Sequence, residues 1–194
     1  MIATTELRKF VIPEIITGID ARFLIDRYLS FFESVHPFIV TDEGVKKHVW
    51  FTEIIEKIQN EVSQFTIFSE VSENPKDTEV HKGLALYINN NCDVIVAIGG
   101  GSPMDCAKGI AIMATNPGNI LDYEGVDLVK NPGPPLCCIP STAGTSADVS
   151  QFAIINDTTR KVKIAIISKK LIPDIALIDP VPLMTMDPYL TACT

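Results

Sequence analysis

Apolar residues along the chain follow two alternating patterns. Short, nearly continuous apolar runs are typical of buried strands, and between them apolar residues recur at helical spacing. Strands are predicted at 7–12, 38–41, 65–68, 93–98, 136–140 and 175–178. Helices are predicted at 19–32, 44–60, 76–90 and from 102 to about 114. A further helix is predicted to begin at Asp187-Pro188, with the Asp as N-cap and the Pro at the first helical position.

The alternation of strands and helices predicts an α/β fold, in which a parallel sheet carries crossover helices on its faces. The run 94–98 is wholly apolar, so we expect it in the middle of the sheet, covered on both sides. Residues 115–135 are rich in Pro, Gly and Asn and predict a long surface loop. The segments 149–155 and 161–167 flank a turn at 156–159, which predicts a β-hairpin.

Three consecutive glycines at 99–101 follow the apolar run directly. Without Cβ atoms, the backbone can approach a ligand closely and can adopt positive φ angles. Ser102, Pro103 and Asp105 suit the N-cap, first and third positions of a helix, so the segment resembles a capping box. The free N–H groups at such a helix start favour a phosphate. A plain strand–helix turn is the alternative, because neither G-x-G-x-x-G nor a Walker loop is present.

Two other polar features are expected at the same edge of the sheet. Asp42 ends the predicted strand at 38–41, at the carboxyl end where open α/β sheets bind ligands. The loop 141–146, Ser-Thr-Ala-Gly-Thr-Ser, follows the predicted strand 136–140 and offers small hydroxyl groups. Adjacent central strands would place this loop and the glycine loop on one crevice, although a polar turn without a ligand remains an alternative.

Charge and composition exclude several classes of function. The 194 residues include 16 Lys and Arg against 24 Asp and Glu, a net charge of −8 that argues against a nucleic-acid partner. No run of 18 apolar residues and no secretory signal is recognisable, so no membrane span is expected. Five cysteines without a C-x-x-C pattern predict reduced thiols in a cytoplasmic protein. The histidines at 36, 48 and 81 lack metal-ligand spacing and are expected on the surface or on helix faces.

These segments together resemble the iron-containing (group III) alcohol dehydrogenase family. The matching stretches, in the family's order and spacing, are 39–42, 74–75, 99–105, 141–145 and 178–180. The resemblance implies a two-domain enzyme, in which a Rossmann-like domain, here residues 1–194, binds a nicotinamide cofactor. A C-terminal helical domain would supply one Asp and three His to a divalent metal, iron or zinc. Residues 190–194 resemble the start of that domain, so none of the four metal ligands is expected in these 194 residues.

The resemblance implies cofactor-binding roles, and no catalytic role, for ten residues. Asp42 would accept hydrogen bonds from the adenosine ribose and repel a 2′-phosphate, which favours NAD over NADP. The others would line the cleft, cradle the pyrophosphate, or reach the ribose and the nicotinamide; they are Asn74, Gly100, Gly101, Ser102, Asp105, Ser141, Thr142, Thr145 and Lys163. Taken alone, Lys163 could be a solvated strand lysine and Asn74 part of a turn.

Two departures from the family pattern concern the substrate side. The family usually has Gly-Ser-Glu after Gly-Thr, whereas this chain has Ser-Ala-Asp at 146–148. Phe152 stands where smaller or polar residues are common. The substrate side of the cleft is therefore expected to differ.

Two functions from different classes remain open. The first is the NAD-binding part of a metal-dependent alcohol dehydrogenase, which transfers hydride between an alcohol or aldehyde and NAD. On that hypothesis the 194 residues alone bind the cofactor and are inactive, and the enzyme is a possible homodimer. The second is a free-standing nucleotide-binding module without catalysis.

Overall fold

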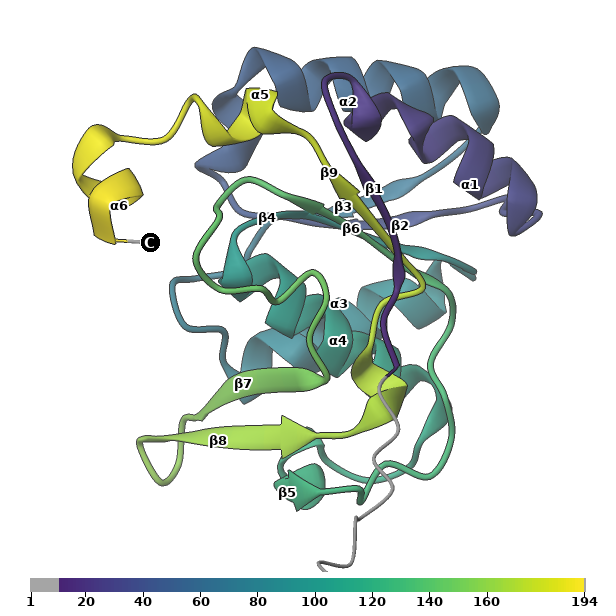
Figure 1. Ribbon diagram of the computed structural model, residues 1–194. Coiled ribbons are helices and arrows are strands. Elements are labelled where there is room, and N and C mark those ends of the chain that lie inside the picture. Colours follow the sequence, from purple (N-terminus) through teal and green to yellow (C-terminus); the bar gives the residue numbers. More distant parts are fainter. Residues whose placement is uncertain (1–10, 194) are drawn as a thin grey trace, which may run out of the picture.

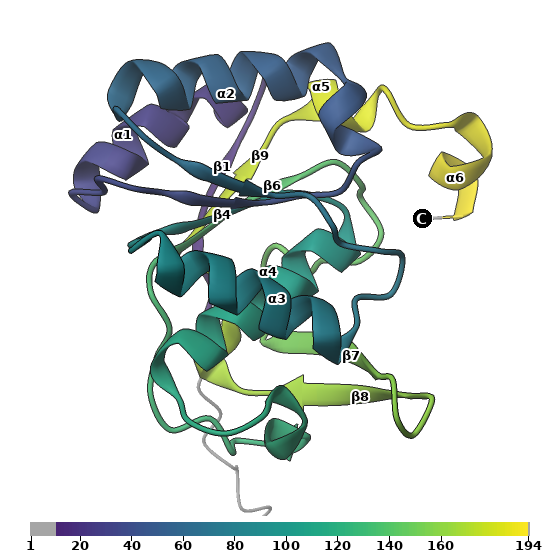
Figure 2. The ribbon, with the colours of Figure 1, turned by 180° about the vertical axis from the view of Figure 1, so that it is seen from behind.

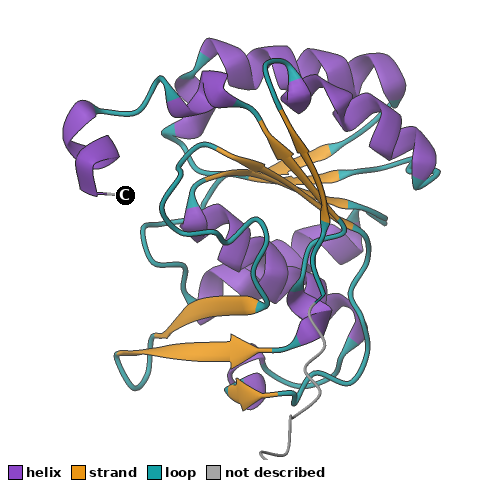
Figure 3. Cartoon of the chain, viewed as in Figure 1, coloured by secondary structure: helices purple, strands orange, loops and turns teal. Residues whose placement is uncertain are grey.

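A six-stranded parallel sheet forms the centre of the molecule (Figures 1 and 3). The computed structural model describes residues 11–193. The sheet has the order β1-β9-β6-β4-β2-β3, and every neighbouring pair in it is parallel. Its strands are β1 (Glu14–Thr17), β2 (Phe38–Val40), β3 (Thr66–Phe68), β4 (Ile95–Gly99), β6 (Leu136–Pro140) and β9 (Ile175–Ile178). Strand β4, the apolar run of the sequence, is buried throughout and lies between β2 and β6, as predicted.

Helices cover both faces of this sheet (Figures 1 and 2). One face packs against α1 (Ile25–Phe31) and α2 (Val49–Glu61), and the other packs against α3 (Asp77–Asn89) and α4 (Gly101–Thr115). Alternate residues of β4 enter the two cores, because side chains on a strand point to opposite faces. Val96 joins the core under α1 and α2, and Ala97 joins the core under α3 and α4. The α/β fold with flanking helices is therefore confirmed.

The predicted β-hairpin is present and forms part of a second, three-stranded sheet (Figure 3). Strands β7 (Phe152–Asp157) and β8 (Val162–Ile167) pair antiparallel, and β5 (Gly125–Val126) joins the edge of β8 in parallel. The segment 115–135, predicted to be a long loop, therefore contains some secondary structure, a 3₁₀ turn at Ile120–Tyr123 followed by β5. The hairpin also begins later than predicted, at Phe152.

The first predicted element differs from the structure, whereas the last is confirmed. Most of the strand predicted at 7–12 lies outside the described residues, and Val11 and Ile12 are in no strand. The edge strand β1 starts instead at Glu14, after Pro13, and pairs with β9. The helix predicted at Asp187-Pro188 is α6 (Pro188–Cys193), and the Asp187 carboxylate accepts from the Tyr189 N–H at 2.9 Å. None of the helices within residues 11–193 is long and apolar enough to cross a membrane.

A buried ion pair fixes the carboxyl end of β9. Asp179 directly follows β9, and its Oδ2 accepts from Arg22 Nη1 at 2.6 Å, with side-chain exposures of 0% and 5%. The second oxygen of Asp179 accepts from Val181 N–H at 2.9 Å and caps the short helix α5 (Pro180–Leu183), which the sequence analysis missed. Arg22 also donates to Glu53 of α2 at 2.9 Å. Asp179 thus joins β9, α5 and the segment before α1.

We predict that Asp179→Asn lowers the free energy of unfolding by about 3 kcal/mol, because it leaves a buried guanidinium without its closest carboxylate. The amide oxygen of Asn can still accept from Val181 N–H and cap α5, so the loss reports the charge and the hydrogen bonds that Asp179 Oδ2 offers to Arg22. Urea unfolding followed by circular dichroism measures the difference. The control is Asp20→Asn, since the Asp20 side chain is 64% exposed and its bond to Arg22 should contribute less than about 1 kcal/mol. Equal effects of the two substitutions would contradict the prediction.

Candidate functional site

The chain leaves neighbouring strands in opposite directions at one edge of the large sheet. Strand β2 continues into α2 on one face, and its neighbour β4 continues into α4 on the other face. The carboxyl ends of two such strands diverge and leave a crevice, where open α/β sheets bind ligands. A cavity of about 720 Å³ occupies this position and is lined by Asp42 after β2 and by Gly100 and Gly101 after β4.

The glycine loop lies close against the side chains of its neighbours. Gly99 has a φ of +146°, which favours glycine, and a Cβ there would lie 2.8 Å from Pro103 Cγ. Gly100 and Gly101 have no such backbone requirement, but both face the neighbouring polar loop closely. A Cβ on Gly101 would lie 2.9 Å from Thr145 Cγ2, and one on Gly100 would lie 3.3 Å from Thr142 Cγ2. Any larger residue would therefore fill the space between the two loops.

The predicted capping box at Ser102 is wrong. Helix α4 begins at Gly101 with Gly100 as N-cap, so Ser102 lies within the first turn. Its hydroxyl accepts instead from the backbone N–H of Asn74 at 3.2 Å. Asn74 has a left-handed φ of +58° and lies in the connection between β3 and α3. Because glycine is tolerated at the N-cap, the helix does not need the Ser102 hydroxyl as a cap. The hydroxyl instead holds the loop that contains Asn74 against the start of α4.

The second polar loop lies beside the first because β6 pairs with β4. The Ser141 N–H donates to the Gly99 carbonyl at 2.9 Å, which extends the pairing by one residue. The Oγ1 of Thr142 is buried and has no hydrogen-bond partner within the part of the chain that the structure describes. A buried hydroxyl without a partner is costly, so a ligand that supplies one would be stabilised here. Thr142 and the start of α4 therefore face the same space.

Asp42 is oriented by its own backbone turn. Its Oδ1 accepts from the N–H groups of Gly44 and Val45, at 2.8 Å each, and so fixes the start of the 3₁₀ turn Val45–Lys47. The carboxylate lines the large cavity while one oxygen makes these bonds. A carboxylate held in this way keeps its remaining acceptor capacity for a ligand.

An adjoining cavity of about 470 Å³ extends the site towards the hairpin. It shares Asn74, Gly101, Ser102 and Thr145 with the larger cavity. Lys163 of β8 lines it and donates to Asn74 Oδ1 at 2.6 Å.

Asp105 of α4 also lines this adjoining cavity, and its Oδ2 accepts from the Ile154 N–H at 3.1 Å. Burial raises the pKa of Asp105 to about 6, and Lys108 and the Ile154 N–H oppose the rise. The site therefore has a carboxyl group that titrates near neutral pH at one end.

A buried lysine attaches the hairpin to α4. Lys108 is 0% exposed, and its Nζ donates to the carbonyls of Ser150 and Phe152 at 2.8 and 2.9 Å and to the Ser150 hydroxyl at 3.2 Å. Burial lowers the pKa of this amine, against the opposing effects of Cys138, Asp105 and Asp148. Lys108 thereby holds Phe152 and the start of β7 at the wall of the adjoining cavity.

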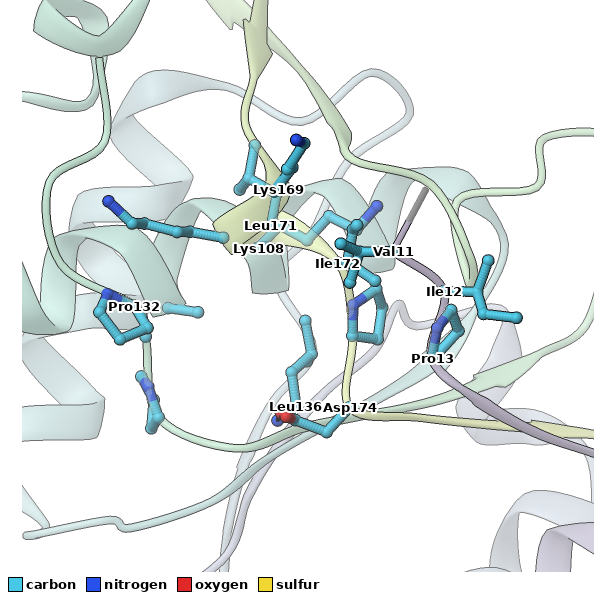
Figure 4. Close-up of a pocket in the computed structure, with 15 residues that line it drawn as sticks. Val11, Ile12, Pro13, Lys108, Pro132, Leu136, Lys169, Leu171, Ile172 and Asp174 are labelled. Carbon is cyan, nitrogen blue, oxygen red and sulfur yellow. Dashed lines mark hydrogen bonds between the residues drawn. The ribbon is translucent and has the colours of Figure 1, made fainter. Parts of the chain in front are cut away.

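A separate cavity of about 360 Å³ lies at the opposite edge of the sheet, where β6 and β9 begin (Figure 4). It is lined by Pro13, Leu136, Leu171 and Asp174 and contains none of the ten predicted site residues. Parallel sheets carry ligands at the carboxyl ends of their strands, so we assign the functional site to the other edge.

All ten predicted residues line one or both of the adjoining cavities. The sequence analysis did not identify another wall of the large cavity, which is formed by His48, Trp50, Pro182 and the residues 185–187. His48, predicted to lie on the surface or on a helix face, is partly exposed and lines this cavity. Its position six residues after Asp42, at the start of the helix that follows, was the available signal.

In residues 11–193 no group of three or more His, Cys, Asp and Glu side chains is arranged to hold a metal ion. Cys92, Cys106, Cys137 and Cys138 are buried free thiols. Burial raises the pKa of Cys106 and of both thiols on β6 well above the ordinary range, which disfavours the reactive thiolate form.

The fold and the site define an α/β protein with a Rossmann-like sheet and a cavity at its topological switch point. The chain belongs to the iron-containing alcohol dehydrogenase family, which it matches over residues 13–180. It is 42% identical over 156 residues to alcohol dehydrogenase 4 of Schizosaccharomyces pombe, a match that covers 80% of this chain and 37% of that protein.

Solved structures show the same fold. A 1,3-propanediol oxidoreductase superposes with a TM-score of 0.94 and 32% identity, over 97% of this chain and 50% of that one. A sulfoacetaldehyde reductase from Bifidobacterium kashiwanohense, solved in complex with NAD⁺, superposes with a TM-score of 0.85 and 27% identity, again over 97% and 50%. The chain thus spans about half the length of these proteins.

We predict that Asp105 makes the fold less stable as the pH rises from about 4 to about 6. The folded state keeps the Asp105 proton over this range, whereas the unfolded chain loses it near the ordinary pKa of about 4, so the free energy of unfolding falls. In Asp105→Asn the amide oxygen can still accept from Ile154 N–H. The side chain no longer titrates, so the pH-dependent contribution of Asp105 to stability is absent. The stability of the variant relative to the natural protein should therefore rise across that pH range in urea unfolding.

The control for this prediction is Glu56→Gln, an exposed carboxylate on α2. Parallel stability profiles of the natural protein and Asp105→Asn between pH 4 and pH 7.5 would contradict the assignment.

Proposed function

We propose that the adjoining cavities bind NAD, with the pyrophosphate between the glycine loop and Thr142. The observation that carries the proposal is the buried Thr142 hydroxyl without a partner, opposite the N-terminus of α4. A phosphate oxygen would accept from that hydroxyl and from the free N–H groups at the start of α4. The residues present therefore fit the cofactor, since Gly100, Gly101 and Thr142 line the same cavity.

The two ends of the cofactor follow from the charged groups. Asp42 would accept hydrogen bonds from the hydroxyls of the adenosine ribose, in the larger cavity. Asp105 and Lys163 line the adjoining cavity and would lie beside the nicotinamide and its ribose. Asn74 would join the two halves of the site, because its N–H and its amide oxygen bond to Ser102 and Lys163.

The reaction we propose for the whole protein is hydride transfer between a small alcohol or aldehyde and NAD. A divalent metal, iron or zinc, is expected to polarise the substrate oxygen in this family. Residues 11–193 provide no ligand set for such an ion, so we assign them no step that involves it. Their part is to bind the cofactor, to orient its nicotinamide towards the substrate and to provide the Phe152 wall on the substrate side.

The second candidate is a nucleotide-binding module without catalysis. Both candidates require the same cofactor site, and we expect these 194 residues alone to bind NAD without turnover in either case. We further propose a cytoplasmic location, which agrees with the buried free thiols, and a homodimer.

We predict that the protein binds NAD at least about tenfold more tightly than NADP, because a carboxylate at the ribose repels a 2′-phosphate. Asp42→Gly should narrow this difference to about twofold. The matched control is Asp42→Asn, which removes the charge but keeps an oxygen that can accept from Gly44 and Val45 N–H. Calorimetric titration measures all affinities. Equal or tighter binding of NADP by the natural protein would remove Asp42 from the ribose site.

We predict that Gly101→Val weakens NAD binding at least about a hundredfold and leaves the fold intact. The valine would meet Thr145 and occupy the space between the two loops where the pyrophosphate is expected. Circular dichroism and the melting temperature check the fold, and Gly101→Ala should give an intermediate affinity. A folded Gly101→Val variant with unchanged affinity would show that the glycine loop is only a turn.

A further inference from the structure

Two stacked aromatic rings line the larger cavity close in sequence to Asp42. The imidazole of His48 lies against the indole of Trp50, with ring centroids 5.4 Å apart and an angle of 17° between the planes. Both residues line the same cavity as Asp42. A flat ring next to a ribose site offers a surface on which the attached base can stack.

The indole of Trp50 is held from several sides. Trp50 is only 4% exposed, and its Nε1–H donates to the Thr185 hydroxyl at 3.0 Å. That hydroxyl in turn donates to the Pro182 carbonyl at 2.7 Å, which ties the indole to α5. His48 is less buried than Trp50 and lines the cavity, where a ligand can reach it. Trp50 is thus a rigid support behind a partly open imidazole.

Short backbone bonds hold His48 at a fixed offset from Asp42. The Asp42 carboxylate accepts from Gly44 and Val45 N–H, and the His48 N–H donates to the Val45 carbonyl at 3.1 Å. The two side chains therefore belong to one folded turn between β2 and α2.

The cavity has one apolar wall and one polar wall. Pro182 and Met186 also line it, and they add apolar surface from the chain after β9. The glycine loop and the hydroxyl residues after β6 form a polar wall instead. A purine base, which is flat and largely apolar on its faces, suits the first wall, and a pyrophosphate suits the second.

We propose that His48 is the platform on which the adenine base of NAD stacks, with Trp50 as a positioning residue behind it. The proposal rests on NAD binding in this cavity and adds the residues that recognise the base. The smallest ligand with all of the required groups is ADP-ribose, which carries the adenine, its ribose and the pyrophosphate. Loss of the imidazole should weaken ADP-ribose and NAD alike, because both lose the same stacking contact.

The test measures ADP-ribose and NAD affinities by calorimetry in four proteins: the natural chain, His48→Ala, His48→Phe and Val49→Ala. We expect His48→Ala to weaken both ligands about tenfold. His48→Phe should restore the affinity to within about twofold, since another aromatic ring can stack. Val49 is 77% exposed at the adjacent position, so Val49→Ala should bind like the natural chain. Melting temperatures confirm that each variant is folded.

A second pair of variants tests Trp50 without replacing it. Thr185→Val removes the acceptor of the indole N–H, and Thr185→Ser keeps it. Thr185→Val should shift the emission of Trp50, the one tryptophan of the sequence, and weaken ADP-ribose about threefold, and Thr185→Ser should do neither.

Three results would overturn the platform. In the first, His48→Ala binds ADP-ribose as tightly as the natural chain; in the second, His48→Phe fails to restore the affinity that His48→Ala loses. In the third, Thr185→Val leaves ADP-ribose affinity unchanged although the emission shifts. If the natural chain binds neither NAD nor ADP-ribose, the proposed function itself fails, which is a different outcome from the other three.

Discussion

Parallel hydrogen bonding on both sides of β4 is the constraint on which the site depends. Because β2 and β6 pair with β4 in the same direction, the residues that follow all three strands meet at one edge of the sheet. Asp42, the glycine loop and the hydroxyl loop are far apart in the sequence and become neighbours for this reason alone. The opposite routes of the chain after β2 and β4 then open the crevice between them. A single change in strand order would separate these groups.

The sequence was sufficient to predict the elements of this constraint. The wholly apolar run at 94–98 indicated a central strand, and residues that end strands indicated the ligand edge. Elements that depend on contacts across the fold were harder to predict. Strand β5 has two residues and forms because β8 lies beside it, and α5 has four residues and is capped by Asp179. Such short elements carry no periodicity that a pattern can reveal.

The errors at the site have the same origin. Ser102 has the right residue type and position for an N-cap, but Asn74 comes from another loop and uses its hydroxyl. His48 was missed because its place in the cavity depends on the stacking with Trp50 and on a wall contributed by residues more than a hundred positions later. Sequence patterns predict hydrogen bonds between a polar side chain and nearby backbone groups, whereas in the folded chain the side chain can bond to residues far away in the sequence.

The anchoring of the hairpin by Lys108 has a consequence for the thermodynamics of ligand binding. Three oxygen atoms of the segment 150–152 accept from the buried amine, so movement of this wall would leave the amine without acceptors. The conformational entropy of this segment is therefore lost during folding and not when a ligand enters. A ligand that binds against an already ordered wall does not have to order that wall. Less of its interaction free energy is therefore offset by lost conformational entropy of the protein.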